Sequence, residues 1–317
     1  MKDLKLPNYK NIAVIGAGAV GGFYGAKLQN FGYKTTFQSG LMKSKKVKTL
    51  KIQSIWGDFT IPSTVVSEWD GKEKFDFIIL SSKIISYDRD IRSFCDALDK
   101  IIHKTSVILV LQNGINIEEA LGKKYPTNPI LGGLAFTCIN RLRADTISHI
   151  DFGLIRMGAL RKEDRKICQS TVRLFNEAGI QTEYLPNLRK GRYEKLLWNI
   201  PFNSLSVLFQ STTEKLVLHE TTEVIARKLM KETLSIARSE KAGLPGHFIE
   251  VMIERTKKMK PYKTSMLLDF ESGKEMEIEA ILGEPLRIAQ KNKVSSPYLE
   301  MMYYQLKHLQ NNHPTLT

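Results

Sequence analysis

A glycine-rich segment that directly follows a short apolar run constrains the fold of this chain most strongly. Residues 11–15 (NIAVI) predict a buried strand, residues 16–21 (GAGAVG) a tight turn, and the following residues a helix to about Asn30, with Gly32 as its stop. A second strand is expected around residues 35–37. Strand, glycines, helix and strand in this order are typical of a dinucleotide-binding unit, whereas the glycine spacing alone is a weak signal. We therefore predict an N-terminal Rossmann-type domain in a protein of the α/β class.

Each glycine of this turn has a separate physical role in such a unit. Gly16 would allow the tight turn, Gly18 would let a pyrophosphate approach the backbone, and Gly21 would let the helix pack on the strand. The amides at the start of the helix would then bind phosphate. The residues expected to contact the cofactor here are Gly16, Ala17, Gly18, Ala19, Val20 and Gly21.

The residues after the second strand indicate which dinucleotide binds. Sites for NAD usually place an acidic residue about 20 residues beyond the glycines, where it binds the ribose 2′-hydroxyl. This chain has residues 38–40 (QSG) at that place and then three lysines, Lys43, Lys45 and Lys46. The missing carboxylate and the nearby cations favour a 2′-phosphate and therefore NADP. The alternative interpretation is an exposed loop that happens to be rich in lysine.

The alternation of strands and helices continues to Pro186, where we place the domain boundary. In an open α/β sheet, ligands bind beyond the carboxyl ends of the strands. Lys83 and Asn113 directly follow two predicted strands, residues 75–80 and 107–111, although an exposed lysine and an ordinary Asn-Gly turn are the alternative interpretations. The other elements expected in this half are a hairpin over 50–61, helices over 87–102 and 164–178, and strands over 130–137, 146–150, 154–157 and 182–185.

The C-terminal half has the pattern of a helical domain. Pro245 and Pro297 suit first-turn positions of helices, and acidic residues in the segment 275–279 suit the positive end of a helix dipole. The expected helices cover residues 188–209, 222–242, 245–259, 274–291 and 297–310.

Three polar residues, Lys195, Asn199 and Asn203, lie at intervals of four in the first of these helices. At this spacing they share one stripe of the helix surface. The rest of the circumference is mostly apolar, which is typical of a buried helix, and buried polar groups need partners. One interpretation is a core helix with hydrogen-bonded amides and a lysine that reaches solvent. The other is a stripe that binds a polar ligand.

Composition and charge exclude several classes of function. The 317 residues favour two domains, and the net charge of +14 comes from scattered lysines without the basic and aromatic runs of a nucleic-acid-binding protein. No apolar stretch approaches the roughly 20 residues that span a bilayer, and no signal peptide is expected. Cys95, Cys138 and Cys168 have neither disulfide nor zinc spacing. We expect a soluble, cytoplasmic protein that binds no metal, nucleic acid or membrane.

Four segments together resemble the ketopantoate reductase (2-dehydropantoate 2-reductase) family. They are GAGAVGG near the N-terminus, the central LQNG, KLLWNIPFNSL at residues 195–205 and SMLLDFESGKEMEIEAILGEPLRIA at residues 265–289. The resemblance covers essentially the whole chain in the right order. It implies a Rossmann-type domain over residues 1–186 and an all-α domain over 187–317, of the kind that ends 6-phosphogluconate dehydrogenase. It further implies NADPH-dependent reduction of ketopantoate to (R)-pantoate in pantothenate and coenzyme A biosynthesis, with the active site in the cleft between the domains.

The resemblance also implies roles for individual residues. Lys195 and Glu277 are the residues implied to be catalytic: Lys195 matches the catalytic lysine, and Glu277 matches an acid that contacts both substrate and cofactor. The residues implied to bind the 2-keto acid substrate are Asn113, Asn199, Asn203, Ser265 and Asp269, and those implied near the cofactor are Lys83, Asn113, Cys138 and Glu277. Reduction of a ketone by hydride leaves an alkoxide, and a positioned lysine can supply the proton or the positive charge that it needs.

The chain departs from the family pattern at two places. A further substrate asparagine of some members falls near residues 211–213 (STT), and an arginine used for the 2′-phosphate is replaced around Gln38 and Ser39. The first departure leaves open a related reductase of another 2-keto acid, and the second bears on the preference for NADP. A non-catalytic NADP-binding sensor is a third possibility. A monomer or a homodimer is expected.

Overall fold

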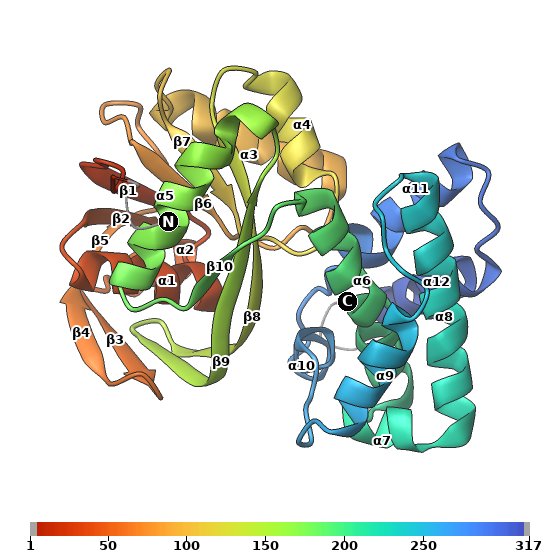
Figure 1. Cartoon of the computed structure of the whole chain (residues 1–317). Coiled ribbons are helices and arrows are strands. Elements are labelled where there is room, and N and C mark those ends of the chain that lie inside the picture. The colour runs from red at the N-terminus through yellow and green to blue at the C-terminus, as the bar shows by residue number, and fades with distance from the viewer. Residues whose placement is uncertain (1–4, 314–317) are drawn as a thin grey trace. The chain divides into compact units, whose positions relative to one another are not determined.

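The computed structural model describes residues 5–313 of the chain, which divides into two compact units (Figure 1). The first unit contains the chain up to residue 83 together with residues 88–112 and 116–188. The second contains residues 84–87 and 113–115 and the chain from residue 189 onward. The helical unit therefore includes two short segments that follow strands of the sheet. The assignment of domains as residues 1–186 and 187–317 stays a prediction.

The sheet of the first unit is parallel at its centre, as predicted. Its strand order is β4-β3-β9-β8-β7-β6-β1-β2-β5, and β10 pairs with β9. The strands β1, β2, β6 and β7 run parallel to one another. The strand bounds are β1 Asn11–Ile15, β2 Lys34–Gln38, β3 Thr49–Ser54, β4 Phe59–Pro62, β5 Thr64–Val66, β6 Phe77–Leu80, β7 Val107–Val110, β8 Ile130–Arg143, β9 Thr146–Ala159 and β10 Thr182–Tyr184.

The prediction of separate strands over 146–150 and 154–157 was wrong. Both belong to β9, which pairs antiparallel with β8 along a hairpin with register shifts in its middle. Phe152 and Gly153 have φ angles of 59° and 116°, so the strand bulges there without ending. A β-carbon on Gly153 would lie 2.4 Å from the Trp56 ring, which shows why the bulge needs glycine.

The helices of the first unit cover the sheet and bury its apolar strands. Alternate residues such as Ile12 and Val14 of β1 share one core with residues of α1 and α5. Because α1 follows β1 through the glycine turn, its N-terminus lies at the carboxyl end of the strand (Figure 1). The helices are α1 Ala19–Asn30, α2 Gly40–Ser44, α3 Tyr87–Ile101, α4 Ile117–Lys124 and α5 Arg165–Glu177, and a 3₁₀ turn covers Lys162–Asp164.

The described elements of the second unit are all helical, as predicted. Its central element is α6, which is continuous from Leu188 to Phe209 through Pro201 and contributes buried residues such as Leu197 and Ile200 to the core. The remaining helices are α7 Thr213–Leu218, α8 Glu220–Ser239, α9 Phe248–Lys257, α10 Ser265–Glu271, a π-helical turn Glu279–Gly283, α11 Glu284–Lys291 and α12 Pro297–Asn311. None of the helices within residues 5–313 is long and apolar enough to cross a membrane.

The helix expected over residues 274–291 starts later than predicted. Residues 274–277 form neither helix nor strand, the helical turns start at Ile278, and a π-helical turn leads into α11. Glu275 and Glu277 therefore precede the helix and do not form its first turn. This frees the Glu277 side chain for a contact outside the helix.

Candidate active site

The glycine turn between β1 and α1 has the geometry expected of a dinucleotide-binding loop. Gly16 has a φ of +83°, and a β-carbon there would lie 2.4 Å from the Ser82 backbone nitrogen. A β-carbon on Gly21 would lie 1.9 Å from the Ser81 hydroxyl oxygen, which donates to the Gly16 carbonyl over 2.9 Å. The tight turn at Gly16 and the close packing at Gly21 thus both require a residue without a side chain.

Gly18 differs from these two glycines because its surroundings are open. A β-carbon on Gly18 would meet only the Gly16 carbonyl oxygen, at 3.9 Å. Gly18 is also the N-cap of α1, where no side chain caps the helix and the first turn has no acidic residue. Uncapped amides at the positive end of a helix dipole suit an anion, so the turn fits the pyrophosphate of a dinucleotide.

The carboxyl end of β2 presents neutral groups next to this turn. The Gln38 carbonyl accepts from the Ala17 amide at 2.9 Å, and the Gln38 side chain accepts from the Trp69 indole at 2.9 Å. Ser39 caps α2 by accepting from the Met42 amide at 3.3 Å. The side chains of Gln38 and Ser39 at this position are both neutral.

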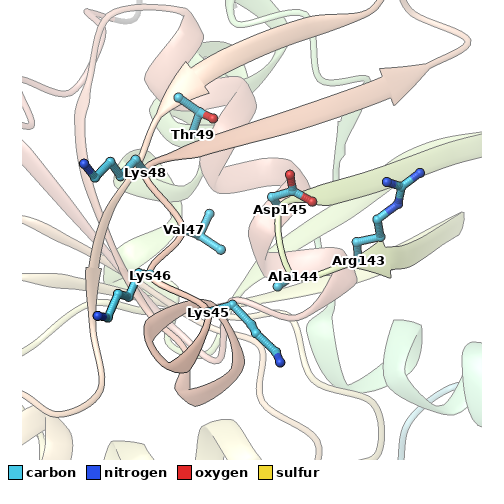
Figure 2. Close-up of a pocket in the computed structure, with 8 residues that line it drawn as sticks. All are labelled: Lys45, Lys46, Val47, Lys48, Thr49, Arg143, Ala144 and Asp145. Atoms are coloured by element: carbon cyan, nitrogen blue, oxygen red, sulfur yellow. The ribbon is translucent and has the colours of Figure 1, made fainter.

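The lysines that follow α2 border a basic hollow of about 460 Å³ (Figure 2). Lys46 and Lys48 direct their amino groups to one side in Figure 2, Arg143 lies on the opposite side, and Asp145 lies between them. Lys45 also borders the hollow. The remaining lining residues are Val47, Thr49 and Ala144. Cationic side chains outnumber carboxylates around this hollow, so it suits an anionic group.

Two other residues expected near the cofactor lie in the first unit. Lys83 is exposed just beyond β6. The segments that follow β6 and β7 are joined by a hydrogen bond from the Gln112 side-chain amide to the Ser82 carbonyl, 2.9 Å long. Cys138 lies half-buried in β8 opposite Asp151, next to a register shift in the hairpin.

In the second unit, α6 carries the predicted polar row on one face. Lys195 is half-buried, and Asn199 and Asn203 are only 7% and 3% exposed. Within residues 5–313, neither asparagine side chain has a hydrogen-bond partner. Buried amides are normally satisfied, so these two retain the capacity to bind a polar ligand.

Glu277 is held next to this row by segments from elsewhere in the chain. Asn113 donates from its side-chain amide to one Glu277 oxygen at 2.9 Å, and the Ile84 backbone amide donates to the other at 3.4 Å. A β-carbon on Gly114 would lie 2.4 Å from the Ala280 carbonyl oxygen. The glycine after Asn113 therefore lets that segment pack directly on the π-helical turn.

The surroundings of Lys195 lower the pKa of its amino group. Burial lowers the pKa of Lys195 to about 7, the Arg192 charge contributes to the lowering, and the Glu277 carboxylate opposes it. Arg192, one helical turn earlier, is itself only 2% exposed. Sequence reasoning missed Arg192, although its spacing of three residues from Lys195 on the same helix was a usable signal. An ammonium with such a pKa can donate a proton at neutral pH.

The two remaining predicted substrate residues lie on α10. Ser265 is the exposed first residue of this helix, and Asp269 is half-buried one turn later. The preceding Thr264 caps the helix and shares a 2.6 Å hydroxyl–hydroxyl hydrogen bond with Ser206 of α6. The start of α10 is thereby attached to α6, near the end of the helix that carries Asn203.

Comparison with known proteins assigns the family. The family model "Ketopantoate reductase PanE/ApbA" matches residues 12–162, and "Ketopantoate reductase PanE/ApbA C terminal" matches residues 187–310. The chain belongs to the ketopantoate reductase family. A 2-dehydropantoate 2-reductase from Nostoc sp. is 36% identical over 97% of this chain and 98% of its own length. This member of the ketopantoate reductases is thus an oxidoreductase that acts on a CH–OH group.

Solved structures agree with this family assignment. The crystal structure of a 2-dehydropantoate 2-reductase from Geobacter metallireducens GS-15 is similar with a TM-score of 0.86 and 30% identity, over 94% of this chain and 99% of that one. A D-mandelate dehydrogenase solved with NADH and anilino(oxo)acetate has a TM-score of 0.85, over 95% of this chain and 98% of that one. Its identity of 20% shows a shared fold alone.

Proposed function

We propose that this ketopantoate reductase family member reduces ketopantoate to (R)-pantoate, with NADPH as hydride donor, in pantothenate and coenzyme A biosynthesis. One observation carries the proposal. Lys195 lies on the same face of α6 as Asn199 and Asn203, two buried amides that have no side-chain partner within residues 5–313. A cation and free amide donors and acceptors in one row suit a substrate that has both a ketone and a carboxylate.

Lys195 acts as the general acid in this mechanism. Bound NADPH would supply the hydride to C2 of the keto acid. The Lys195 ammonium donates its proton to the ketone oxygen as negative charge develops there, and the neutral amine regains a proton from solvent afterwards. A pKa of about 7 suits the step because about half of the donor is protonated at neutral pH and the donor releases its proton readily.

Glu277 keeps this acid oriented and charged. Its carboxylate opposes the lowering of the Lys195 pKa, and its two oxygens are held by Asn113 and by the Ile84 amide. We assign Glu277 to contacts with both substrate and cofactor and Asn113 to the same region. Both roles rest on the match to the family motifs and on this hydrogen bond.

The substrate carboxylate is assigned to hydroxyl and amide donors. Asn199 and Asn203 would donate from α6, and Ser265 from the first turn of α10, where its exposed hydroxyl has access to solvent. Asp269 lies four residues after Ser265 on the same helix, so it can support that side of the site without facing the carboxylate directly.

The cofactor is assigned to the first unit. The backbone of residues 16–21 would bind the pyrophosphate, and Lys43, Lys45 and Lys46 would attract the 2′-phosphate that distinguishes NADP from NAD. The basic hollow in Figure 2 supports this assignment because Lys45 and Lys46 line it together with Arg143. Lys83 and Cys138 are assigned to the nicotinamide side.

The experiment that tests this function is NADPH oxidation by the purified chain with a panel of 2-keto acids. We expect ketopantoate to give the highest kcat/KM, above pyruvate, 2-ketoisovalerate and benzoylformate. A preference for another acid would make the chain a related reductase. Tight NADPH binding without oxidation by any of them would indicate a sensor.

The oligomeric state is proposed to be a monomer or a homodimer. Light scattering of the purified chain measures it directly. A larger assembly would contradict the proposal.

A further inference from the structure

Arg141 lies near the tip of the β8–β9 hairpin and contacts the back of the glycine turn. One terminal nitrogen of its guanidinium donates to the carbonyls of Ala17 and Gly18, at 2.9 Å and 3.0 Å. The other donates to the Ala144 carbonyl at 2.7 Å. Arg141 therefore joins the glycine turn to the hairpin tip, whose residues Arg143, Ala144 and Asp145 also border the hollow in Figure 2.

The Arg141 guanidinium is not fully hydrogen-bonded in this position. Its Nε atom is buried and has no hydrogen-bond partner within residues 5–313. Burial lowers the pKa of Arg141 to about 10 while Asp145 opposes the change, so the guanidinium stays charged at neutral pH. A half-buried cation whose buried N–H group has no partner costs stability, and such a group in a native protein calls for an explanation such as a functional role.

Gly22 provides the space that this arrangement requires. A β-carbon on Gly22 would lie 2.7 Å from the nearer terminal nitrogen of Arg141 and 2.6 Å from a methyl group of Ile147. The fourth glycine of the segment thus has a role separate from the three that form the turn. It lets a guanidinium lie against the first turn of α1.

We propose that Arg141 is a positioning residue for the dinucleotide: it holds the Ala17 and Gly18 carbonyls and places a positive charge behind the pyrophosphate site. Carbonyl oxygens that faced an anion would repel it, whereas carbonyls held by Arg141 leave the amides of the turn available. The charge adds to the positive end of the α1 dipole, and the first turn of α1 contains no acidic residue. This inference rests on the proposed binding of NADPH at the glycine turn.

NADPH and NADH both contain the pyrophosphate, whereas only NADPH has the 2′-phosphate assigned to the lysines. Comparing the two dinucleotides therefore distinguishes an effect of Arg141 from an effect of the lysines. Arg141→Met should weaken both dinucleotides by the same factor, about tenfold, which is the size that the effect of a charge at a partly buried helix end can reach. Adenosine 2′-monophosphate, which has no pyrophosphate, should bind as it does to the wild type. The Kd for NADPH should also rise less steeply with salt concentration in this variant than in the wild type, because one charge is missing.

The experiment is a fluorescence titration of the full chain with NADPH and NADH, with calorimetry for adenosine 2′-monophosphate. Arg165→Met removes an exposed arginine of the same unit and should leave every Kd unchanged. Arg141→Lys keeps the charge but cannot hold both the turn and the hairpin, so it should weaken NADPH by less than Arg141→Met does. It decides the question if the methionine variant does not fold.

Three results are distinguishable. An unchanged NADPH Kd in a folded Arg141 variant would overturn the proposal. An equal loss of affinity for adenosine 2′-monophosphate would overturn it too, because it would show a general structural role. Failure of the wild type to bind NADPH at all would refute the proposed function itself.

Discussion

The glycine turn of the first unit and the polar row of the second unit are built by different means. The turn depends on backbone conformation and on missing side chains, as at Gly16 and Gly21. The row depends on side chains that α6 presents and on Glu277, which Asn113 holds from a segment far away in the sequence. A backbone site of this kind sets affinity for a group that many enzymes share. A side-chain site sets which reaction takes place.

This difference predicts that substitutions in the two regions change different constants. Variants of the turn should change Kd for the dinucleotide and leave the chemistry intact. Variants of the row should change kcat or KM for the keto acid and leave dinucleotide binding intact. The variants below test that division, beginning with the largest expected effect.

Lys195→Met should lower kcat by about 10²–10⁴-fold, because the general acid is lost while the volume of the side chain is kept. The Kd for NADPH should be unchanged. The matched control is Lys231→Met, which removes an exposed lysine of α8.

The same variant separates a catalytic lysine from a structural one. Folding lowers the pKa of Lys195, so the charged form destabilises the native state, fully below about pH 7 and progressively less up to the unfolded pKa. Melting curves of Lys195→Met should therefore show equal or higher stability than the wild type at pH 6, and a smaller difference at high pH. A lower Tm with near-normal kcat would contradict the catalytic role.

Ser265→Ala should raise KM for ketopantoate roughly ten- to a hundredfold, from the loss of about 1.5–3 kcal/mol for one hydrogen bond to a charged group. Steady-state kinetics measure the change. Ser235→Ala removes an exposed hydroxyl of α8 and should have no effect. A KM that stays the same in the folded Ser265 variant would remove this residue from the substrate site.

Two alanine variants of the turn form a matched pair. Gly18→Ala adds a methyl group in open space, so the free energy of unfolding should be unchanged while NADPH binds about tenfold more weakly. Gly21→Ala places a methyl group 1.9 Å from the Ser81 hydroxyl oxygen and should lower the free energy of unfolding by about 1–3 kcal/mol. Denaturant unfolding and NADPH titration of both variants measure the pair. A loss of stability in Gly18→Ala, together with weaker NADPH binding but unchanged stability in Gly21→Ala, would contradict the roles assigned to these glycines.

Replacing Lys43, Lys45 and Lys46 by Ala one at a time should have the smallest effect. Exposed ion pairs are worth about 0.2–1 kcal/mol, so NADPH affinity should fall less than tenfold at one or more of these positions. NADH affinity should stay the same, as should both affinities in the exposed control Lys123→Ala. Equal wild-type affinity for NADPH and NADH would argue against any 2′-phosphate site here.

Local sequence was enough to predict the turn and the central helix. Gly16 and Gly21 have their predicted roles because both depend on residues close in sequence or in the adjacent strand. The helix over residues 188–209 was predicted with its observed bounds. Its many apolar side chains are typical of a buried helix.

Sequence reasoning failed where tertiary contacts decide the structure. Residues 151–153 (DFG) have the composition of a turn, yet the partner strand β8 holds them as a bulge within β9. The acidic residues before Ile278 have the composition of a helix start, yet Glu277 precedes the helix and accepts a hydrogen bond from Asn113, 164 residues away in sequence. The contact of Arg141 with Ala17 and Gly18 spans more than 120 residues in sequence and had no local signal.

The pH dependence of the single-turnover rate at which bound NADPH reduces ketopantoate tests the central claim most directly. Lys195 must be protonated to act, and its pKa is about 7. The rate should therefore be constant at low pH and fall about tenfold per pH unit above pH 7. In Lys195→Met the residual rate should show no such fall. A wild-type rate that does not change with pH, or no oxidation of NADPH by ketopantoate, would contradict the account.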